Sequence, residues 1–420
     1  MKRELELQKL ADEIKGQGFK AICFWLPSYG VGGGVLAFYR FAVCLREKTD
    51  LNVYYVDYEG GYLQEMLHDA GISLIPYRDE DYAFSLQEKC VIITNSTRPI
   101  LLQQMRPDNK LLFWHWDTAP CAWELVFLQN EAENYFQLCM EKGAMVFHDW
   151  SSWDILSQNV GFEFKKAFLP VYIDPHGAET DGGLICETEM HLTWLGRLVP
   201  DKIYSLFYVI ENLAQYPTER KKVFHIIGDG RSRKEVERYC ARFGSKIVFD
   251  FRGTMDIEEL DEFLVENSDV LFAMGTSVLE GAARKIPAAV VLLGTAPIRS
   301  DEFFWIFDSK EYCCGVLTTQ KKRFGVEYSH FRDMMDDIFE YGMKKELGER
   351  CFQYYEKHHS GVGYTAGCLL EVAKNSSMTM GDLQTCIRYV PYHHIKLMQR
   401  TFFGRRLSDK VIFETDGGET

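Results

Sequence analysis

Several hallmarks of secreted and membrane-spanning proteins are missing from this sequence of 420 residues. No apolar run approaches the roughly 18 residues that a helix needs to cross a bilayer. The polar start, residues 1–8, lacks the apolar core of a signal peptide. The 12 cysteines are scattered, with no Cys-x-x-Cys pair and no metal-ligand spacing to histidine. We therefore expect a cytoplasmic protein with reduced thiols.

A basic excess is missing as well, because the formal net charge is −14. A general nucleic-acid-binding protein needs a basic footprint, so this class is not expected. The apolar share of 46% and the charged share of 26% are typical of a globular chain. At this length the chain should form two or three domains. A local basic site for a phosphate-bearing ligand remains compatible with the acidic total.

The sequence does contain a regular alternation of short apolar runs and helical patterns in both halves. Alternating strands and helices require a parallel sheet that is covered on both faces. We expect an α/β fold with two doubly wound parallel-sheet (Rossmann-like) domains facing each other across a cleft. The predicted strands of the first half cover residues 21–27, 51–57, 72–76, 91–95, 111–115 and 145–148, and a segment at 166–175 closes the series. Those of the second half begin with residues 191–196, 223–227 and 247–251.

The polar, glycine-bearing stretch at residues 176–183 is the best candidate for a linker. We place one Rossmann-like domain at residues 1–178 and the other at residues 185–355. Helices within residues 356–420 are expected to cross back to the N-terminal domain and to end in a basic amphipathic tail. Such a tail either lies on an anionic membrane surface or packs on the first domain with its charges solvated.

The most informative stretch covers residues 271–293. It predicts a buried strand, a tight Gly-Thr-Ser turn, a helix that opens at Ser277 and a second strand after Pro287. Thr276 and Ser277 stand at the helix start, where free backbone N–H groups and the helix dipole favour an anion. Glu280 is expected in the first turn, either facing the ligand or simply favouring the dipole. Open α/β sheets bind nucleotides at such strand ends, so a nucleotide-dependent activity is the first hypothesis.

Two further loops follow strands in the second half. Arg197 and Lys202 leave a strand end close together, where they can hold a diphosphate or simply flank a helix cap at Asp201. The Gly228-Asp-Gly230 turn lets backbone approach a ligand or pack tightly as a structural turn. The order of these loops and the helix start favours one common site.

The first half contributes a glycine-rich loop after its first strand. Gly32, Gly33 and Gly34 are more glycines than folding requires, and tight helix–sheet packing accounts for one of them.

A strand end in the first half also carries polar side chains between tryptophans. His115 and Asp117 lie there, in an aromatic lining typical of sugar sites. A plain structural role for His115 is the alternative. His148 with Asp149 is a second candidate pair.

On these residues the sequence resembles the retaining GT-B glycosyltransferases of the large family that builds bacterial surface polysaccharides. That family has a Gly-Arg-Leu…Lys segment, an Ile-Gly-Asp-Gly turn, a Phe-x-Gly turn and a Glu-x7-Glu segment followed by Pro-Val. The matching stretches here are residues 196–202, 227–230, 251–253 and 272–280, with Ile286-Pro287 after them.

The resemblance implies a nucleotide-sugar donor on the C-terminal domain and an acceptor on the N-terminal side. Arg197 and Lys202 would neutralise the leaving diphosphate, and Glu280 would accept hydrogen bonds from the ribose hydroxyls. His115 and Asp117 would lie near the acceptor and the reacting carbon. The other donor-side residues in this assignment are Gly32, Gly33, Gly34, Gly230, Arg252, Thr276 and Ser277.

Two positions depart from the family pattern. The family's first glutamate, which contacts the donor sugar, falls on Phe272, and Ile203 stands where a glycine usually follows the lysine. A phenyl ring cannot accept a hydrogen bond from a sugar hydroxyl. The donor sugar and the stereochemistry of transfer therefore stay open.

The resemblance thus implies a metal-independent hexosyltransferase, with retention of configuration as the family's stereochemistry and inversion left open by Phe272. It would move a hexose from a nucleotide-diphosphate sugar to a saccharide or lipid-linked acceptor in cell-surface polysaccharide biosynthesis. No cofactor beyond the donor substrate, no metal and no nucleic acid are expected, and the tail is a candidate for peripheral contact with the inner membrane. A nucleotide-sugar epimerase of similar architecture and a non-catalytic nucleotide-sugar-binding subunit are the alternatives.

Overall fold

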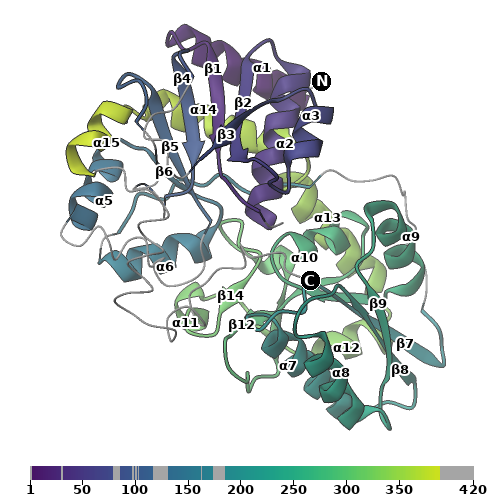
Figure 1. Cartoon of the computed structure of the whole chain (residues 1–420). Helices are drawn as coiled ribbons and strands as arrows, with labels where there is room; N and C mark the ends of the chain where they lie inside the picture. Colours follow the sequence, from purple (N-terminus) through teal and green to yellow (C-terminus); the bar gives the residue numbers. More distant parts are fainter. Residues whose placement is uncertain are drawn as a thin grey trace. The chain divides into compact units, whose positions relative to one another are not determined.

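The chain path of the computed structural model is shown in Figure 1, and the described residues are 2–29, 32–78, 86–96, 99, 102, 104–116, 131–161, 163–173 and 185–387. Within these residues the chain forms two compact units. Unit 1 takes its described positions from residues 2–148, 152–170 and 362–387, and unit 2 from residues 149–151 and 171–361. The predicted linker at 176–183 and the predicted tail from Arg388 onward lie outside the described residues.

Unit 1 is built on a sheet of six parallel strands in the order β3-β2-β1-β4-β5-β6. Their bounds are β1 (Ala21–Trp25), β2 (Asn52–Tyr58), β3 (Ser73–Tyr77), β4 (Cys90–Thr94), β5 (Lys110–His115) and β6 (Met145–Phe147). Every residue of β1, β4 and β5 is buried, as expected for strands covered on both faces. The predicted segment at 166–175 differs, because its described residues form isolated bridges at Phe168 and Ile173 instead of a strand of this sheet.

The described helices of unit 1 include segments from both ends of the chain. Their bounds are α1 (Lys2–Gly16), α2 (Gly33–Lys48), α3 (Gln64–Asp69), α5 (Glu131–Glu141), α6 (Trp150–Val160, of which the first two residues belong to unit 2), α14 (Val362–Asn375) and α15 (Met380–Cys386). Helices α1 and α14 pack against each other. Thr379 and Asp382 form a capping box at the start of α15, and Thr379 also forms a bridge to Lys110 at the start of β5. These contacts attach the last described helices to the sheet of unit 1.

Unit 2 has a seven-stranded sheet in the order β15-β13-β11-β10-β7-β8-β9. Its bounds are β7 (Glu189–Leu195), β8 (Lys221–Ile227), β9 (Val248–Gly253), β10 (Val270–Ala273), β11 (Ala288–Val290), β13 (Glu302–Trp305) and β15 (Ser329–His330). The five strands from β11 to β9 are parallel, whereas β13 and β15 extend the sheet in antiparallel fashion. A separate parallel pair is formed by β12 (Leu292–Leu293) and β14 (Val316–Leu317). The prediction of two α/β units with parallel sheets is confirmed, with this antiparallel edge added.

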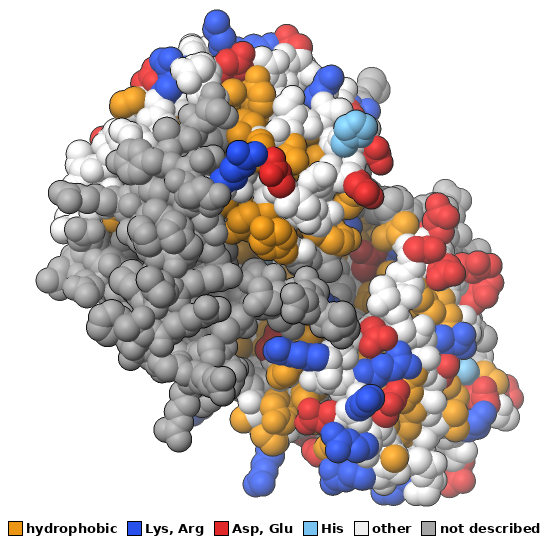
Figure 2. All heavy atoms as spheres, viewed as in Figure 1, with side chains coloured by type: hydrophobic (Ala, Val, Ile, Leu, Met, Phe, Trp, Pro, Cys, Tyr) orange, Lys and Arg blue, Asp and Glu red, His pale blue; other side chains and the backbone are white. Residues whose placement is uncertain are grey.

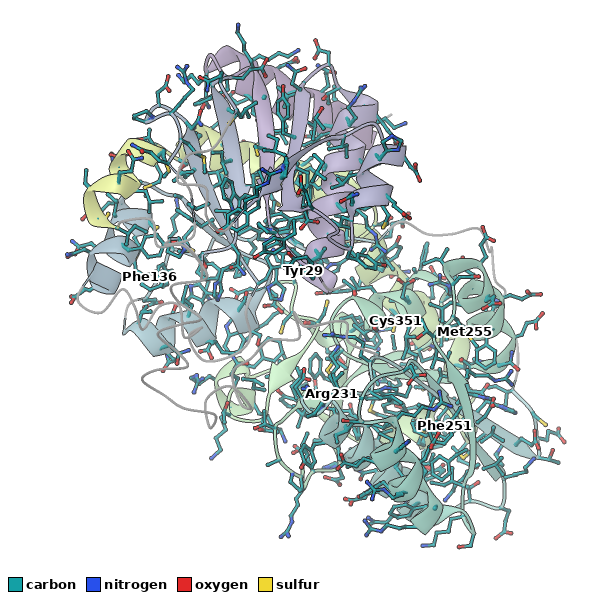
Figure 3. All side chains as sticks on the ribbon, in the orientation of Figure 1. Tyr29, Phe136, Arg231, Phe251, Met255 and Cys351 are labelled. Atoms are coloured by element: carbon teal, nitrogen blue, oxygen red, sulfur yellow. The ribbon has the colours of Figure 1, made fainter. Side chains whose placement is uncertain are left out.

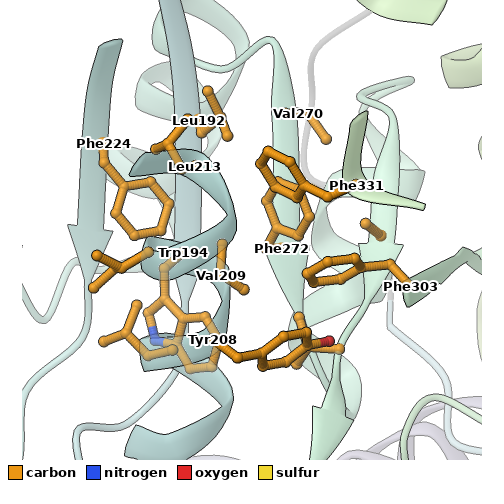
Figure 4. Packing of buried hydrophobic residues seen from close by; sticks show 14 of the residues in the cluster. Leu192, Trp194, Tyr208, Val209, Leu213, Phe224, Val270, Phe272, Phe303 and Phe331 are labelled. Atoms are coloured by element: carbon orange, nitrogen blue, oxygen red, sulfur yellow. The ribbon is translucent and has the colours of Figure 1, made fainter. Parts of the chain in front are cut away.

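The core of unit 2 lies between its strands and helix α7 and is dominated by aromatic rings. Figure 4 shows Trp194 and Phe224 from the strands packing on the face of α7 that carries Val209 and Leu213. All four side chains are buried. The described helices of this unit are α7 (Ile203–Gln215), α8 (Arg233–Cys240), α9 (Ile257–Asn267), α10 (Thr276–Ala283), α11 (Lys321–Phe324), α12 (Phe331–Phe339), α13 (Lys344–His358) and the 3-10 turns η2 (Ala241–Phe243) and η3 (Ile306–Asp308).

Each sheet has a point where the strand order reverses. In unit 1 the chain runs from β1 outward to β2 and β3, and β4 then pairs on the other side of β1. In unit 2 the chain runs from β7 to β8 and β9, and β10 then pairs on the other side of β7. Open α/β sheets bind ligands outside the carboxyl ends of strands at such points. The loops after β1, β4, β7 and β10 are therefore the first places to look for a site.

Candidate functional site

The loops after β7 and β8 pack directly against each other at the carboxyl edge of unit 2. The Leu198 N–H donates a hydrogen bond of 2.9 Å to the Asp229 carbonyl. A Cβ atom at Gly228 would lie 2.2 Å from the Gly196 carbonyl oxygen, and one at Gly230 would lie 2.5 Å from the Leu198 carbonyl oxygen. The close approach of the two loops therefore requires both glycines. This supports the interpretation of Gly228-Asp-Gly230 as a tight structural turn. Contact between Gly230 and a donor stays a prediction.

The two predicted phosphate-binding cations occupy the loop after β7 and the start of α7. Arg197 is exposed, and Lys202 is the partly exposed N-cap residue of α7. No side-chain hydrogen bond caps this helix, so the alternative with Asp201 as the capping side chain is wrong. Figure 2 shows Lys and Arg side chains gathered on the visible face of unit 2 around α7 and α8.

A third cation at this edge, Arg231, was not among the predicted site residues. It follows the glycine turn after β8, and the next residue, Ser232, donates its N–H to the Leu198 carbonyl at 2.9 Å. This bond fixes the backbone beside Arg231 against the loop that carries Arg197, and Figure 3 labels Arg231 in unit 2. Its position directly after a glycine turn at a strand end was the available signal in the sequence.

Helix α10 begins with a glycine in an unusual backbone conformation. Gly275 is the N-cap residue, with a φ of 63° that a side chain would strain. The helix therefore begins at Thr276, one residue before the predicted start at Ser277. Thr276 and Ser277 remain in the first turn, partly exposed, where backbone N–H groups lack partners inside the helix. The Gly275 N–H itself donates to the Cys314 carbonyl at 2.7 Å.

The register of the sheet places this helix start next to the cationic loop. Ala273, at the end of β10, pairs with Leu195, at the end of β7. Neighbouring strands lie about 4.8 Å apart, so the chain segments that follow these residues leave the sheet side by side. The structure thus brings the loop of Arg197 and the start of α10 to the same edge, at the point of strand reversal.

Glu280 lies deeper in the unit than predicted. It is in the second turn of α10 rather than the first, and only 9% of its surface is exposed. The Arg284 Nη1 atom donates both to the Glu280 carbonyl oxygen, at 2.6 Å, and to its Oε2 atom, at 2.8 Å. Arg284 also forms an ion pair with Asp261 of α9. Burial lowers the pKa of Arg284 to about 10.

Phe272, at the position of the family's first glutamate, is a core residue of β10. Its ring is fully buried, stacks on Phe331 with a centroid separation of 5.7 Å and meets the edge of Phe303 at 5.3 Å. Figure 4 shows the three rings together. The side chain therefore stabilises the interior of unit 2.

Arg252 is drawn toward α9 on the last parallel strand of the sheet. Its Nε atom donates to the Asp250 carboxylate at 2.6 Å, and its guanidinium lies 4.8 Å from the centroid of the Phe263 ring. The same carboxylate shares a hydrogen bond of 2.8 Å with His225, whose pKa is lowered by burial. Strand β9 is two strands away from β7, and the observed contacts of Arg252 are with Asp250 and Phe263. Its role at the donor stays a prediction.

In unit 1 only one of the predicted loop glycines has a packing reason. A Cβ atom at Gly34 would lie 3.5 Å from the Trp116 ring, whereas at Gly32 and Gly33 it would meet nothing within 4 Å. Gly32 is the N-cap residue of α2 and has an extended backbone, which any residue can adopt. Packing thus accounts for one glycine, as the structural alternative allowed, and contact of the other two with a donor stays a prediction.

His115 ends β5 and is almost completely buried, with 2% of its surface exposed. Its Nδ1 atom shares a hydrogen bond of 2.6 Å with the Ser96 hydroxyl, from the loop after β4. Ser96 was not among the predicted site residues, although it belongs to a polar triplet directly after a buried strand. Asp117, the predicted partner of His115, lies outside the described residues.

The second histidine of the first half lies next to the first. The His148 N–H donates to the His115 carbonyl at 3.2 Å. The His148 ring stacks on Trp116 with a centroid separation of 5.1 Å and an interplanar angle of 5°. Asp149 belongs to unit 2. The described part of the first-half site is thus His115 with Ser96, beside a layer of aromatic rings.

Two general properties follow from the described residues. Among them, no group of three or more His, Cys, Asp or Glu side chains is arranged to hold a metal ion. None of their helices combines the length and the apolar composition that crossing a membrane requires.

No protein-family model and no curated protein matches the sequence, but solved structures match the fold. HepE (Alr3699) from Anabaena, in complex with UDP and glucose, is similar over 86% of this chain and all of that chain, with a TM-score of 0.54 and 14% identity. A glycosyltransferase from Rickettsia africae is similar over 85% of this chain and 98% of that chain, with a TM-score of 0.57 and 14% identity. The lipopolysaccharide outer core galactosyltransferase WaaB is similar over 84% and 99%, with a TM-score of 0.50 and 11% identity. The chain therefore has the GT-B fold, with two Rossmann-like α/β units.

Proposed function

We propose that this protein is a glycosyltransferase that moves a hexose from a nucleotide-diphosphate sugar to a saccharide or lipid-linked acceptor. The observation that carries the proposal is the meeting of the Arg197 loop and the start of α10 at the strand reversal of unit 2. The fold shared with HepE, which binds UDP and glucose, and with the galactosyltransferase WaaB supports the same reaction class. The finer expectations, retention of configuration and a role in surface polysaccharide synthesis, belong to this proposal.

In the proposed mechanism the leaving diphosphate is stabilised by fixed positive charge. Arg197, Lys202 and the first-turn N–H groups of α10 would oppose the negative charge that develops as the sugar–phosphate bond breaks. Arg231 would add a third cation at the same edge. These groups would do the work of a metal ion, so turnover should persist in the presence of a chelator.

Glu280 would contribute to donor binding through the ribose rather than through the sugar. Its buried carboxylate is held by Arg284, so any hydroxyl that reaches it meets a fixed acceptor. His115, with its ring orientation set by Ser96, would serve the acceptor side. The proposed division is therefore a donor on unit 2 and an acceptor on unit 1.

A panel of nucleotide sugars, incubated with the purified protein, tests the proposal. Release of nucleoside diphosphate that depends on an added acceptor supports sugar transfer. Conversion of the donor without an acceptor would instead identify an epimerase. Tight donor binding without turnover would identify a binding subunit, an outcome favoured by the burial of Phe272 where the family has a glutamate.

A matched pair of arginine variants ties the activity to the site. Arg197→Ala should weaken donor binding, because it removes a cation from the loop after β7. Arg238→Ala is the control. This arginine of α8 is exposed, and its observed hydrogen bond stays within its own helix, to the Lys234 carbonyl. Equal donor affinities of the two variants in titration calorimetry would contradict the proposed site.

A further inference from the structure

A cluster of aromatic side chains lies at the carboxyl edge of the sheet in unit 1. Trp25, Tyr58 and Tyr77 are the last residues of β1, β2 and β3. Together with four neighbours they line a small hollow, whose lining among the described residues is Trp25, Leu26, Pro27, Tyr58, Tyr77, Thr94 and Asn95. The hollow opens beside the reversal point between β1 and β4, because Thr94 ends β4 and pairs with Trp25. It is therefore placed where open α/β sheets take a ligand.

The rings of this cluster hold one another in fixed orientations. Tyr58 and Tyr77 meet edge to face at 5.4 Å, and Trp25 meets Tyr77 in the same manner at 5.7 Å. Tyr29 stacks on Tyr58 at 4.3 Å with an interplanar angle of 7°. Tyr29 is nevertheless 49% exposed, and Figure 3 labels it at the edge of unit 1. A rigid, half-exposed stack of rings is a platform for another flat surface.

Charge selects among the ligands that such a platform could take. None of the seven described residues that line the hollow carries a charge; apart from the polar groups of its aromatic side chains, its polar side chains are Thr94 and Asn95. A phosphate would find no cation among these residues to offset the loss of its bound water. A neutral ring with hydroxyl groups has no such penalty.

We propose that this hollow and the Tyr29–Tyr58 platform bind a neutral sugar ring of the acceptor. The apolar face of the ring would lie on the tyrosines, and one hydroxyl would enter the hollow toward Asn95, because the hollow has room for about one group of the size of a water molecule. This inference rests on the proposed glycosyltransferase function and narrows its acceptor to an uncharged saccharide end. The chain segment itself connects the hollow to the acceptor-side histidine, because Ser96, two residues after Thr94, bonds His115.

Saturation-transfer NMR with neutral methyl glycosides and the corresponding sugar 1-phosphates, without any nucleotide, tests the proposal. The expected result is saturation transfer to the ring protons of a neutral glycoside. Tyr29→Ala and Tyr58→Ala should each weaken that binding about threefold to tenfold, as the loss of one ring contact predicts. The control is Tyr364→Ala, which removes a partly exposed tyrosine from α14 of the same unit.

Three outcomes would overturn the proposal. The first is the absence of neutral-glycoside binding, and the second is equal binding of the glycoside by the wild type and all three variants. The third is tighter binding of the sugar 1-phosphates, with no loss in the Tyr29 and Tyr58 variants. If Tyr58→Ala proves unstable, Tyr29→Ala alone still tests the proposal. Because Tyr29 is half exposed, its substitution should leave the fold intact.

Failure of the inference is distinguishable from failure of the proposed function. Donor turnover that is equal in wild type and in the tyrosine variants, at every acceptor concentration, would overturn the acceptor site while preserving the glycosyltransferase. Glycoside binding in a protein that binds no nucleotide sugar would support the hollow and contradict the function.

Discussion

Arg284 binds Glu280 twice through one atom, since its Nη1 atom donates to the Glu280 carbonyl at 2.6 Å and to the Glu280 carboxylate at 2.8 Å. Its Nη2 atom pairs with Asp261, so one guanidinium joins α10 to α9. All three side chains are buried. The residue proposed to bind the ribose is therefore also part of the framework of unit 2.

Removing the guanidinium should destabilise the protein strongly. In Arg284→Met the carboxylates of Glu280 and Asp261 stay buried without their cation, which costs about 3–5 kcal/mol of unfolding free energy. Arg284→Lys should lose less, because it keeps the charge. Urea denaturation measures both, with Arg238→Ala as the exposed arginine control. A loss below about 1 kcal/mol for Arg284→Met would contradict the framework role.

Arg231 provides a test of the cationic edge that does not disturb the fold. Arg231→Ala should weaken the binding of a nucleoside diphosphate about tenfold, because an exposed arginine–phosphate contact is lost. The affinity for the matching nucleoside, which lacks the phosphates, should not change. Titration calorimetry of both ligands at low and high salt is the measurement. An equal loss for both ligands would place the effect away from the diphosphate.

The same substitution at two glycines should affect the free energy of unfolding to very different extents. Gly228→Ala forces a Cβ atom to within 2.2 Å of a backbone oxygen, at a φ of 127°, and should lower the unfolding free energy by about 1–3 kcal/mol. Gly33→Ala meets nothing within 4 Å and should change it by less than about 0.5 kcal/mol. If the loop before α2 approaches the donor, Gly33→Ala should lower turnover nevertheless. Unchanged turnover would leave this glycine without a role at the donor.

Asp57 should make stability depend on pH in an unusual direction. Burial raises the pKa of this carboxyl to about 6, against the opposing effect of the hydrogen bonds from Ser28 and Tyr58. The folded chain then holds the proton more tightly than the unfolded chain. The stabilisation is complete below about pH 4 and is lost as the pH rises to about 6, at a cost of roughly 3 kcal/mol.

Asp57→Asn removes this titration and isolates its contribution. The free energy of unfolding, measured by denaturation between pH 4 and pH 7, should fall with rising pH more steeply in the wild type than in the variant. The variant should also be the more stable protein at pH 7. Parallel pH profiles of the two proteins would show that Asp57 does not titrate in this range.

The sequence alone predicted the features that depend on neighbouring residues. The buried run at 271–273 and the glycine turn after it located β10 and the start of α10 to within one residue. Parallel sheets follow from alternating strands and helices, so the edge shared by Arg197 and Thr276 could be anticipated. Phe272 could also be identified as unable to act as the missing glutamate, although its burial against Phe303 and Phe331 could not.

The features that escaped prediction depend on contacts between distant residues. Asp261 of α9 pairs with Arg284, 23 positions later at the end of α10, only in the folded chain. Ser96 reaches His115 across two adjacent strands, 19 residues apart in the sequence. The two antiparallel strands at the sheet edge are short, and a run such as Ser329–His330 carries too little hydrophobic pattern to mark a strand.

The two outer strands of unit 2 have a consequence for how copies of this protein behave at high concentration. A strand with free backbone groups at the rim of a sheet invites pairing with another chain, and short or charged rims discourage it. At one rim the strand β15 is only two residues long. At the other rim the strand β9 carries the charged side chains of Asp250 and Arg252. Neither rim is a good template for sheet-to-sheet growth, so concentrated solutions should resist aggregation by this route.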